Sequence, residues 1–419
     1  FTGVFSATTY WIGIKHSEML SSENSNNWSN IDIVLEHLAN NYVDSLEIEK
    51  LSENSINNIL KDLDPHSSYI PANQRQRLNE SLVGHFGGIG IRFMIYNDTL
   101  TVVDVINGGP SESVNINKRD RIITIDDENV AGVNLTNEDV LKKLKGVVGS
   151  AVKLSIIKPN KNIEIKNIIR GSIPLKSIPA FTILKNEIGY IKISSFSNST
   201  DIEFKKALNI LIEKGMKSLI LDLRFNGGGY LHQAINVADE FLKKNKLIVY
   251  TEGAHSKKRT FFSRSEGLFE NGKLIILVNS STASASEIVS GAIQDNDRGL
   301  ILGRRTFGKG LVQQPLLLPD SSELRITTSR YYTPSGKCIQ KPYGSNINYN
   351  DDIYQRMDNG ELTDTSYIND TSSIKKYGEG GIIPDIFIPI DTTSNTLAFN
   401  ELLYTTILRD YCFDYFESH

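Results

Sequence analysis

Strand-like and helix-like segments alternate four times between residues 185 and 303 of this chain. Short apolar runs are followed by segments with helical spacing, as in "SLILDL" before "GGGYLHQAINVADEFLKK" and "KLIILVN" before a helix at 284–294. This order predicts an α/β domain with a largely parallel sheet. Sites in such sheets form where strands turn into helices at their carboxyl ends. The turns "RFNGGGY" and "NSSTASASE" are therefore the candidate sites.

Other patterns flank this domain. Residues 30–85 begin with apolar positions at spacings of three and four, which predict helices. Residues 86–162 alternate apolar and polar positions and contain one helical stretch, "NEDVLKKLKG", which predicts a small β-rich domain. The polar stretch 343–373 is interpreted as a loop insertion, and residues 391–419 as the start of a C-terminal helical region.

The beginning of the sequence, "FTGVFSATTYWIGI", is apolar, uncharged and too short to span a bilayer. Together with the polar stretch that follows, residues 1–29 are interpreted as the remnant of a signal peptide or membrane anchor plus a linker. A loose amphipathic N-terminus is the alternative.

Composition excludes several functional classes. The length of 419 residues predicts two or three domains. The net charge is −4, with 45 basic and 49 acidic residues and no basic run, so nucleic-acid binding is not expected. The only cysteines, Cys338 and Cys412, lie in no metal-ligand pattern, and one bridge between them is left open. The histidines show no ligand spacing, so no metal and no cofactor are expected.

Hydroxyl residues crowd the start of the predicted helix at 284. A serine there would lie beside free backbone N–H groups and the positive end of the helix dipole, which suits attack on a carbonyl. The alternative is an ordinary helix cap. A base is also required, and Lys309 in "TFGKGLVQQ" is a candidate because burial lowers the pKa of an amine. In an extended segment Gln313 would share its face. An exposed Gly-Lys-Gly turn is the alternative.

The chain resembles the carboxyl-terminal processing peptidases, serine proteases of the tail-specific protease family. The resemblance covers about residues 30–390 and rests on motifs that occur in the family's order: "LDPHSSYI", "GGIGI", "GGP…DRIITIDDE", "LILDLRFNGGGYL", "SASEIVSGAIQDNDR", "GRRTFGKGLVQ", "TTSRYYTPSGKCIQ" and "GIIPDI". It implies a Ser–Lys dyad of Ser284 and Lys309, with Gln313 four positions after the lysine.

The same resemblance implies further site residues. The N–H of Ala285 and that of Gly227 or Gly228 would form the oxyanion hole; family members often have Asn-Pro-Gly-Gly where this chain has Asn226-Gly227-Gly228-Gly229. The β-rich domain would be a PDZ domain, which binds a peptide's C-terminal carboxylate. Its carboxylate loop would comprise Gly88, Ile89, Gly90 and Ile91, although such a run alone is also typical of a plain β-turn.

The implied architecture is a mixed α/β and β multidomain protein. A crotonase-like, ClpP-like α/β protease core at 163–390 carries the inserted PDZ domain at 86–162 and follows the N-terminal helical region. The implied function is a serine endopeptidase that cleaves protein or peptide substrates with free, apolar C-termini. We expect it in the bacterial cell envelope on the periplasmic side, with an inner-membrane anchor, and leave self-association open. The alternatives are a catalytically inert PDZ scaffold and an acyl-CoA enzyme.

Overall fold

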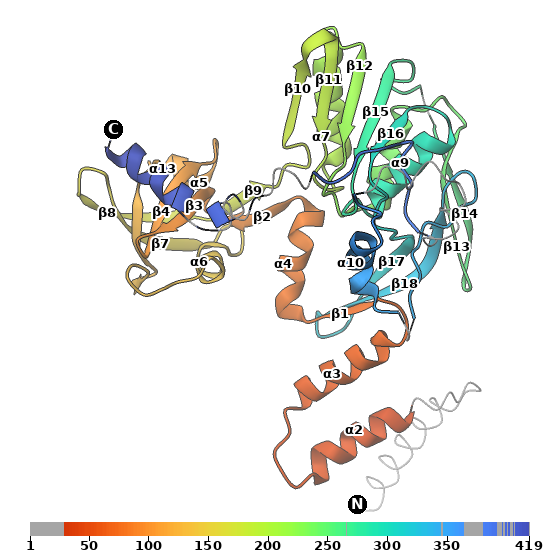
Figure 1. Cartoon of the computed structure of the whole chain (residues 1–419). Coiled ribbons are helices and arrows are strands. Elements are labelled where there is room, and N and C mark those ends of the chain that lie inside the picture. Colours follow the sequence, from red (N-terminus) through yellow and green to blue (C-terminus); the bar gives the residue numbers. More distant parts are fainter. Residues whose placement is uncertain are drawn as a thin grey trace, which may run out of the picture.

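The computed structural model describes residues 29–264, 266–344, 347–363, 380–391 and 407–418, together with 396, 399, 401–402 and 405. The predicted anchor remnant and linker therefore lies outside the described residues, apart from Ser29. No helix within the described ranges has the length and apolar character needed to cross a membrane. Figure 1 shows a large α/β body, a smaller β-rich lobe joined to it, and a helical arm toward the N-terminus.

The predicted parallel sheet is confirmed. Its six strands follow the order β10-β11-β12-β15-β16-β19, and only the edge pair β10–β11 is antiparallel. The strands are β10 (Ala180–Leu184), β11 (Ile188–Lys192), β12 (Ser218–Asp222), β15 (Lys273–Val278), β16 (Leu300–Gly303) and β19 (Ile386–Phe387). The helices between them are α7 (Thr200–Glu213), α8 (Leu231–Asp239) and α9 (Ala285–Asp295). Buried residues of these strands and helices form one apolar core, which fixes the turns at the strand ends.

A second sheet completes the large body. It comprises β1 (Ser68–Ile70), β13 (Leu247–Gly253), β14 (Ser256–Phe262), β17 (Leu311–Leu317) and β18 (Glu323–Tyr332). All its pairings are antiparallel. The segment "LIVYTEG" is a strand, as predicted, but as β13 it pairs with β14 and β18 and does not extend the parallel sheet. The short hairpin into β14 satisfies its backbone, so it needs no crossover helix.

The small lobe has its own sheet and core. Its strands are β3 (Ile91–Tyr96), β4 (Thr99–Val105), β5 (Arg121–Ile125), β6 (Glu128–Asn129), β7 (Ala151–Ile157) and β8 (Ile163–Ile169), with helices α5 (Pro110–Ser113) and α6 (Asn137–Leu144). The predicted boundary at 162 is wrong, because β8 pairs with β7 along its whole length. The turn at 158–161 resembles a linker in sequence but closes a hairpin.

The lobe joins the body through a two-stranded stem. Strand β2 (His85–Gly88) enters the lobe and pairs antiparallel with β9 (Gly171–Pro174), which leaves it. At the base of the stem the N–H of Leu175 donates to the carbonyl of Gly84 at 2.8 Å. The β-rich domain is therefore an insertion whose two ends meet.

Helices frame both parts. The N-terminal helices predicted at 30–85 are α2 (Ser29–Asn41), α3 (Ile48–Lys61) and α4 (Ala72–Val83). The remaining helical elements are η1 (Lys185–Glu187), η2 (Tyr349–Asp351), α10 (Asp352–Asp358) and α13 (Ile407–Ser418). Helix α13 lies against the small lobe, where the rings of Phe413 and Tyr96 are 4.4 Å apart (Figure 1). Cys338 and Cys412 are both free thiols, so the bridge left open by the sequence is not formed.

Candidate active site

Two turns at the carboxyl ends of neighbouring strands form one surface. The turn after β12 and the turn after β15 are joined by Asn226, whose carbonyl accepts from the Ala283 N–H at 3.0 Å and from the Ser286 hydroxyl at 3.1 Å. The Thr282 hydroxyl donates back to the Leu223 carbonyl at 2.9 Å. These buried bonds hold the glycine turn beside Ser284.

Ser284 immediately precedes helix α9, as predicted. Its backbone has φ 56° and ψ −116°, which a residue with a β-carbon rarely adopts. A β-carbon on Gly228 would lie 2.8 Å from Cβ of Ser284 and 3.0 Å from the nitrogen of Ala285. The strained backbone therefore presents the serine to the helix N-terminus and to the glycine turn together.

Lys309 lies in the loop between β16 and β17, and Gln313 lies on β17. Nζ of Lys309 donates to Oε1 of Gln313 at 3.1 Å, as the spacing of four predicts. Nε2 of Gln313 donates to the backbone carbonyl of His66, 247 residues earlier. That second bond fixes which end of the amide faces the lysine. Burial lowers the pKa of Lys309 from its ordinary value of 10.5; the charge of Arg325 acts in the same direction, and those of Asp64 and Glu287 oppose it.

The buried carboxylate of Glu287 ties the serine and lysine segments together. Its Oε2 accepts the backbone N–H of Ser284 at 2.7 Å and that of Lys309 at 2.9 Å. Its Oε1 accepts the Gly308 N–H at 2.7 Å and the Thr306 hydroxyl. Burial raises the pKa of Glu287 to about 7, and the four donors oppose that rise because they stabilise the carboxylate. All four groups donate to Glu287, so together they favour its ionised form.

Tyr331 makes a second bridge between the same residues. Its buried hydroxyl lies 3.0 Å from the Ser284 carbonyl and is also within hydrogen-bonding distance of the Lys309 carbonyl. Glu287 and Tyr331 thus place the two backbones side by side. In the described part of the chain no hydrogen bond joins the Ser284 hydroxyl to the Lys309 amine; such contacts often tighten only when substrate binds.

Two backbone N–H groups of the turns that carry Ser284 and the glycines are unused within the described residues. Among the described residues no hydrogen bond involves the N–H of Ala285 or of Gly227. The N–H of Gly228 donates to Oδ1 of Asn226 at 2.8 Å and is not free in this arrangement. Gly228 lies against Ser284 whereas the N–H of Gly227 is unused, so both predicted glycines stay candidates for the partner of Ala285 in an oxyanion hole.

The predicted carboxylate loop of the small lobe lies between β2 and β3. Gly88 ends β2, Ile91 begins β3, and Gly90 has φ +78°, which favours glycine. The carbonyl of Ile89 accepts the backbone N–H of Ser111, and the carbonyl of Gly90 accepts that of Ile106, both inside the lobe. Their own N–H groups make no hydrogen bond within the described ranges, and β3 is an edge strand. The loop thus leaves donors without a partner among the described residues at the start of an edge strand.

The sequence did not identify Glu287, Tyr331 or His66 as site residues. Glu287 follows Ser284 by three positions, the spacing of a capping box, and this signal could have identified it. Burial and the charge of Lys309 lower the pKa of His66 to about 4, and its Nε2 lies 2.9 Å from the Tyr349 hydroxyl. Tyr331 and His66 carry no local signal, because their partners are distant in sequence.

Comparisons with known proteins give two family matches and several similar proteases. Residues 187–350 match peptidase family S41 and residues 87–168 match the PDZ domain. The chain is 35% identical over 313 residues to a carboxy-terminal-processing protease of Bartonella bacilliformis, covering 73% of this chain and 71% of that protein. It is 31% identical over 324 residues to the carboxy-terminal processing protease CtpA of Bacillus subtilis, covering 77% of this chain and 68% of that protein. A solved structure of a photosystem II D1 C-terminal processing protease aligns with a TM-score of 0.45 and 24% identity over 87% of this chain and 93% of that one.

The fold and site thus define a serine peptidase that carries a PDZ domain. The chain belongs to peptidase family S41, the carboxy-terminal-processing proteases. The alternative of an inert PDZ scaffold finds no support, since the matched relatives are proteases.

Proposed function

We propose that this enzyme cleaves protein substrates near their C-termini, with Ser284 as nucleophile and neutral Lys309 as general base. The observation that carries the proposal is the shared carboxylate of Glu287, which accepts the backbone N–H of both residues. The half-buried amine held by Gln313 supports the base role, because burial favours its neutral form.

The reaction proceeds in two halves. Oγ of Ser284 attacks the scissile carbonyl while Lys309 takes its proton, and the N–H groups of Ala285 and of Gly227 or Gly228 bind the oxyanion. Protonated Lys309 then gives its proton to the leaving amine, which produces an acyl-enzyme. Water, deprotonated by Lys309, hydrolyses the ester and regenerates Ser284. The lone pair of Gln313 Oε1 keeps the amine pointed at the serine throughout.

The PDZ domain would select the substrate. The free N–H groups of Ile89 and Gly90 suit a C-terminal carboxylate, and the edge of β3 suits an added strand. A PDZ domain of a carboxy-terminal protease from Vibrio cholerae has been solved with a bound peptide, which supports this assignment. We further propose a periplasmic location with a membrane anchor, on the basis of the family resemblance and the apolar start of the sequence. Fractionation of cells expressing the full-length protein tests that location.

The cleavage assay compares two serine variants on an unfolded protein substrate with an apolar, free C-terminus. Ser284→Ala should abolish cleavage, because it removes the only proposed nucleophile. Ser281→Ala removes an exposed hydroxyl three residues earlier and should cleave like the wild type. Both should show the wild-type circular dichroism spectrum. Retained cleavage by folded Ser284→Ala would refute the assignment.

A further inference from the structure

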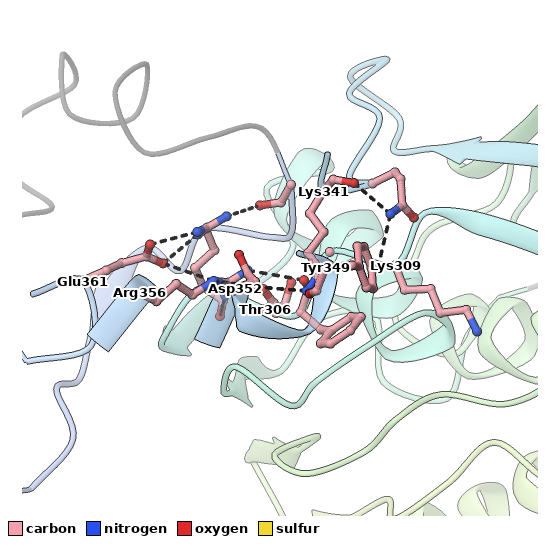
Figure 2. A network of polar contacts seen from close by, with 12 residues as sticks. Thr306, Lys309, Lys341, Tyr349, Asp352, Arg356 and Glu361 are labelled. Atoms are coloured by element: carbon pink, nitrogen blue, oxygen red, sulfur yellow. Dashed lines mark hydrogen bonds and ion pairs between the residues drawn. The ribbon is translucent and has the colours of Figure 1, made fainter. Parts of the chain in front are cut away.

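The excursion between β18 and β19 carries a buried arginine. Sequence reasoning treated residues 343–373 as a loop insertion, yet its described part contains helix α10 and Arg356, whose side chain is only 2% exposed. A fully buried arginine is uncommon and has to be paired. Figure 2 shows that Arg356 lies in a continuous polar network beside Thr306, and that the amine of Lys309 points away from this network.

Arg356 binds the chain segment that leads to Lys309. Nη1 donates to the carbonyls of Arg305 and Thr306 at 3.2 and 2.9 Å, and Nη2 donates to that of Phe307 at 3.3 Å. Three successive carbonyls thus face one guanidinium group, whose planar set of donors suits such an array. Phe307 is only two residues before Lys309, so the path of the backbone into the lysine is defined by these bonds.

Acidic groups hold the guanidinium in place. Nε of Arg356 lies 3.0 Å from Oδ2 of Asp352 and 4.0 Å from Oε1 of Glu361. Glu361 also binds Arg305 through two bonds, at 2.6 and 2.8 Å. The same excursion therefore fixes the segment 305–307 both through its carbonyls and through the side chain of Arg305.

Glu287 holds the following residues from its own side. It accepts the Thr306 hydroxyl and the N–H groups of Gly308 and Lys309, as described above. The segment 305–309 is thus bound from two sides. The buried guanidinium group of Arg356 donates to its carbonyls, and the buried carboxylate of Glu287 accepts from its N–H and hydroxyl groups. Loosening the cation removes the bonds to three successive carbonyls before Lys309 and leaves the bonds of Glu287 and Tyr331 in place.

We propose that Arg356 is a positioning residue for the catalytic base, acting through the backbone of residues 305–307 to keep Lys309 in its half-buried, Gln313-bound position. This inference rests on the proposed role of Lys309. It assigns a task in the peptidase reaction to an excursion that lies outside the Ser–Lys–Gln set. Because the Arg356 side chain is only 2% exposed, the proposed role works through the chain and not through contact with substrate.

The test compares Arg356→Lys with Arg298→Lys, using a short peptide substrate. Arg298 is a matched control: it is partly buried and donates to the carbonyls of Phe241 and Phe269, at the far end of helix α9 from Ser284. The compact ammonium group of a lysine cannot reproduce the planar, spread set of donors that the guanidinium group presents to these carbonyls. In Arg356→Lys we expect kcat to fall roughly 10- to 100-fold, as for small misplacements of a catalytic group, with KM nearly unchanged.

The pH profile separates positioning from plain destabilisation. If Arg356→Lys lets water reach the amine, the acid limb of the kcat profile should move to higher pH, because hydration favours the charged lysine. Arg298→Lys should lose comparable stability without moving that limb. Glu361→Gln weakens the ion pair between Glu361 and Arg305. It should lower kcat and move the acid limb to higher pH, both by less than Arg356→Lys does.

Failure can be assigned to one proposal or the other. If Arg356→Lys and Glu361→Gln keep the kcat and pH profile of Arg298→Lys, the positioning role is refuted while the peptidase assignment stands. If Arg356→Lys does not fold, the Glu361→Gln profile decides in the same way. If Lys309→Arg retains wild-type activity, the proposed base is refuted, and the inference about Arg356 is refuted with it.

Discussion

The amine of Lys309 occupies a site that disfavours its positive charge. Burial is the largest cause of its lowered pKa, and the nearby Arg325 adds to it. The side chain has one described partner, the neutral amide of Gln313, and no carboxylate within hydrogen-bonding distance. Such an arrangement suits a base and is unfavourable for folding, since the unfolded chain holds the proton freely.

Replacing the lysine with an apolar residue of similar length should therefore stabilise the protein. At pH values below the lowered pKa of Lys309, the amine is charged in the folded state, and its burial reduces the free energy of unfolding by the full amount. Between that pKa and 10.5 the unfolded state binds more protons, so the free energy of unfolding of the wild type rises with pH. Lys309→Met should be inactive yet more stable than the wild type at pH 7, with a difference that shrinks toward pH 10.

Urea unfolding at several pH values measures this difference. Lys273→Met, which replaces an exposed lysine at the start of β15, is the control and should show no comparable gain. A Lys309→Met protein that is less stable than the wild type at pH 7 would mean that the amine stabilises the fold, contrary to the account.

At the level of elements, a few loops on rigid strand ends build the site. Much of this was predictable: the strand-helix alternation placed the turns after β12 and β15 at one edge, and the motif "SASE" placed Ser284 before α9. The partners of Lys309 were harder to predict. His66 and Arg356 come from segments whose sequence pattern indicates a turn and a loop, and only the fold brings them to the lysine and its neighbours.

The carboxylate loop is the element that should set substrate choice. A charge-assisted hydrogen bond contributes about 1.5–3 kcal/mol, so a substrate with an amidated C-terminus should be cleaved roughly ten- to a hundredfold less efficiently than the free acid. Gly90→Val should reproduce that loss, because φ is +78° there and an added β-carbon would lie 3.2 Å from Ile173 Cδ1.

Measuring kcat/KM for matched free-acid and amidated substrates checks this expectation. Short peptides that do not reach the PDZ domain serve as the control, and Gly90→Val should cleave them as the wild type does. Equal cleavage of the two long substrates would show that the domain does not recognise C-termini and acts as a spacer or a cover.

At the scale of the whole molecule, the described part of the chain contains two bodies with separate cores. The PDZ domain buries its own apolar cluster, which shares no residue with the cluster of the protease body. The stem of β2 and β9 brings the ends of the insertion together at the Gly84–Leu175 bond. Across the boundary, Arg77 and Glu80 on α4 pair with Glu138 and Lys145 of the PDZ domain. These ion pairs connect the two bodies, and each body has an apolar core of its own.

Each body should therefore fold without the other. Residues 84–175 expressed alone should unfold cooperatively in urea, as a small domain with one core does. A protease body in which a short loop joins residues 84 and 175 should still cleave short peptides while losing its preference for free C-termini. A joined body that is folded but inactive on short peptides would show that the PDZ domain contributes directly to the active site.

The central claim is that neutral Lys309 deprotonates Ser284, and the pH dependence of kcat/KM tests it most directly. The wild type should gain activity with rising pH through an apparent pKa well below the ordinary lysine value of 10.5. Lys309→Arg should be folded and inactive at every accessible pH, because a guanidinium group does not lose its proton. Near-normal turnover by Lys309→Arg, or a wild-type profile without that acid limb, would contradict the account.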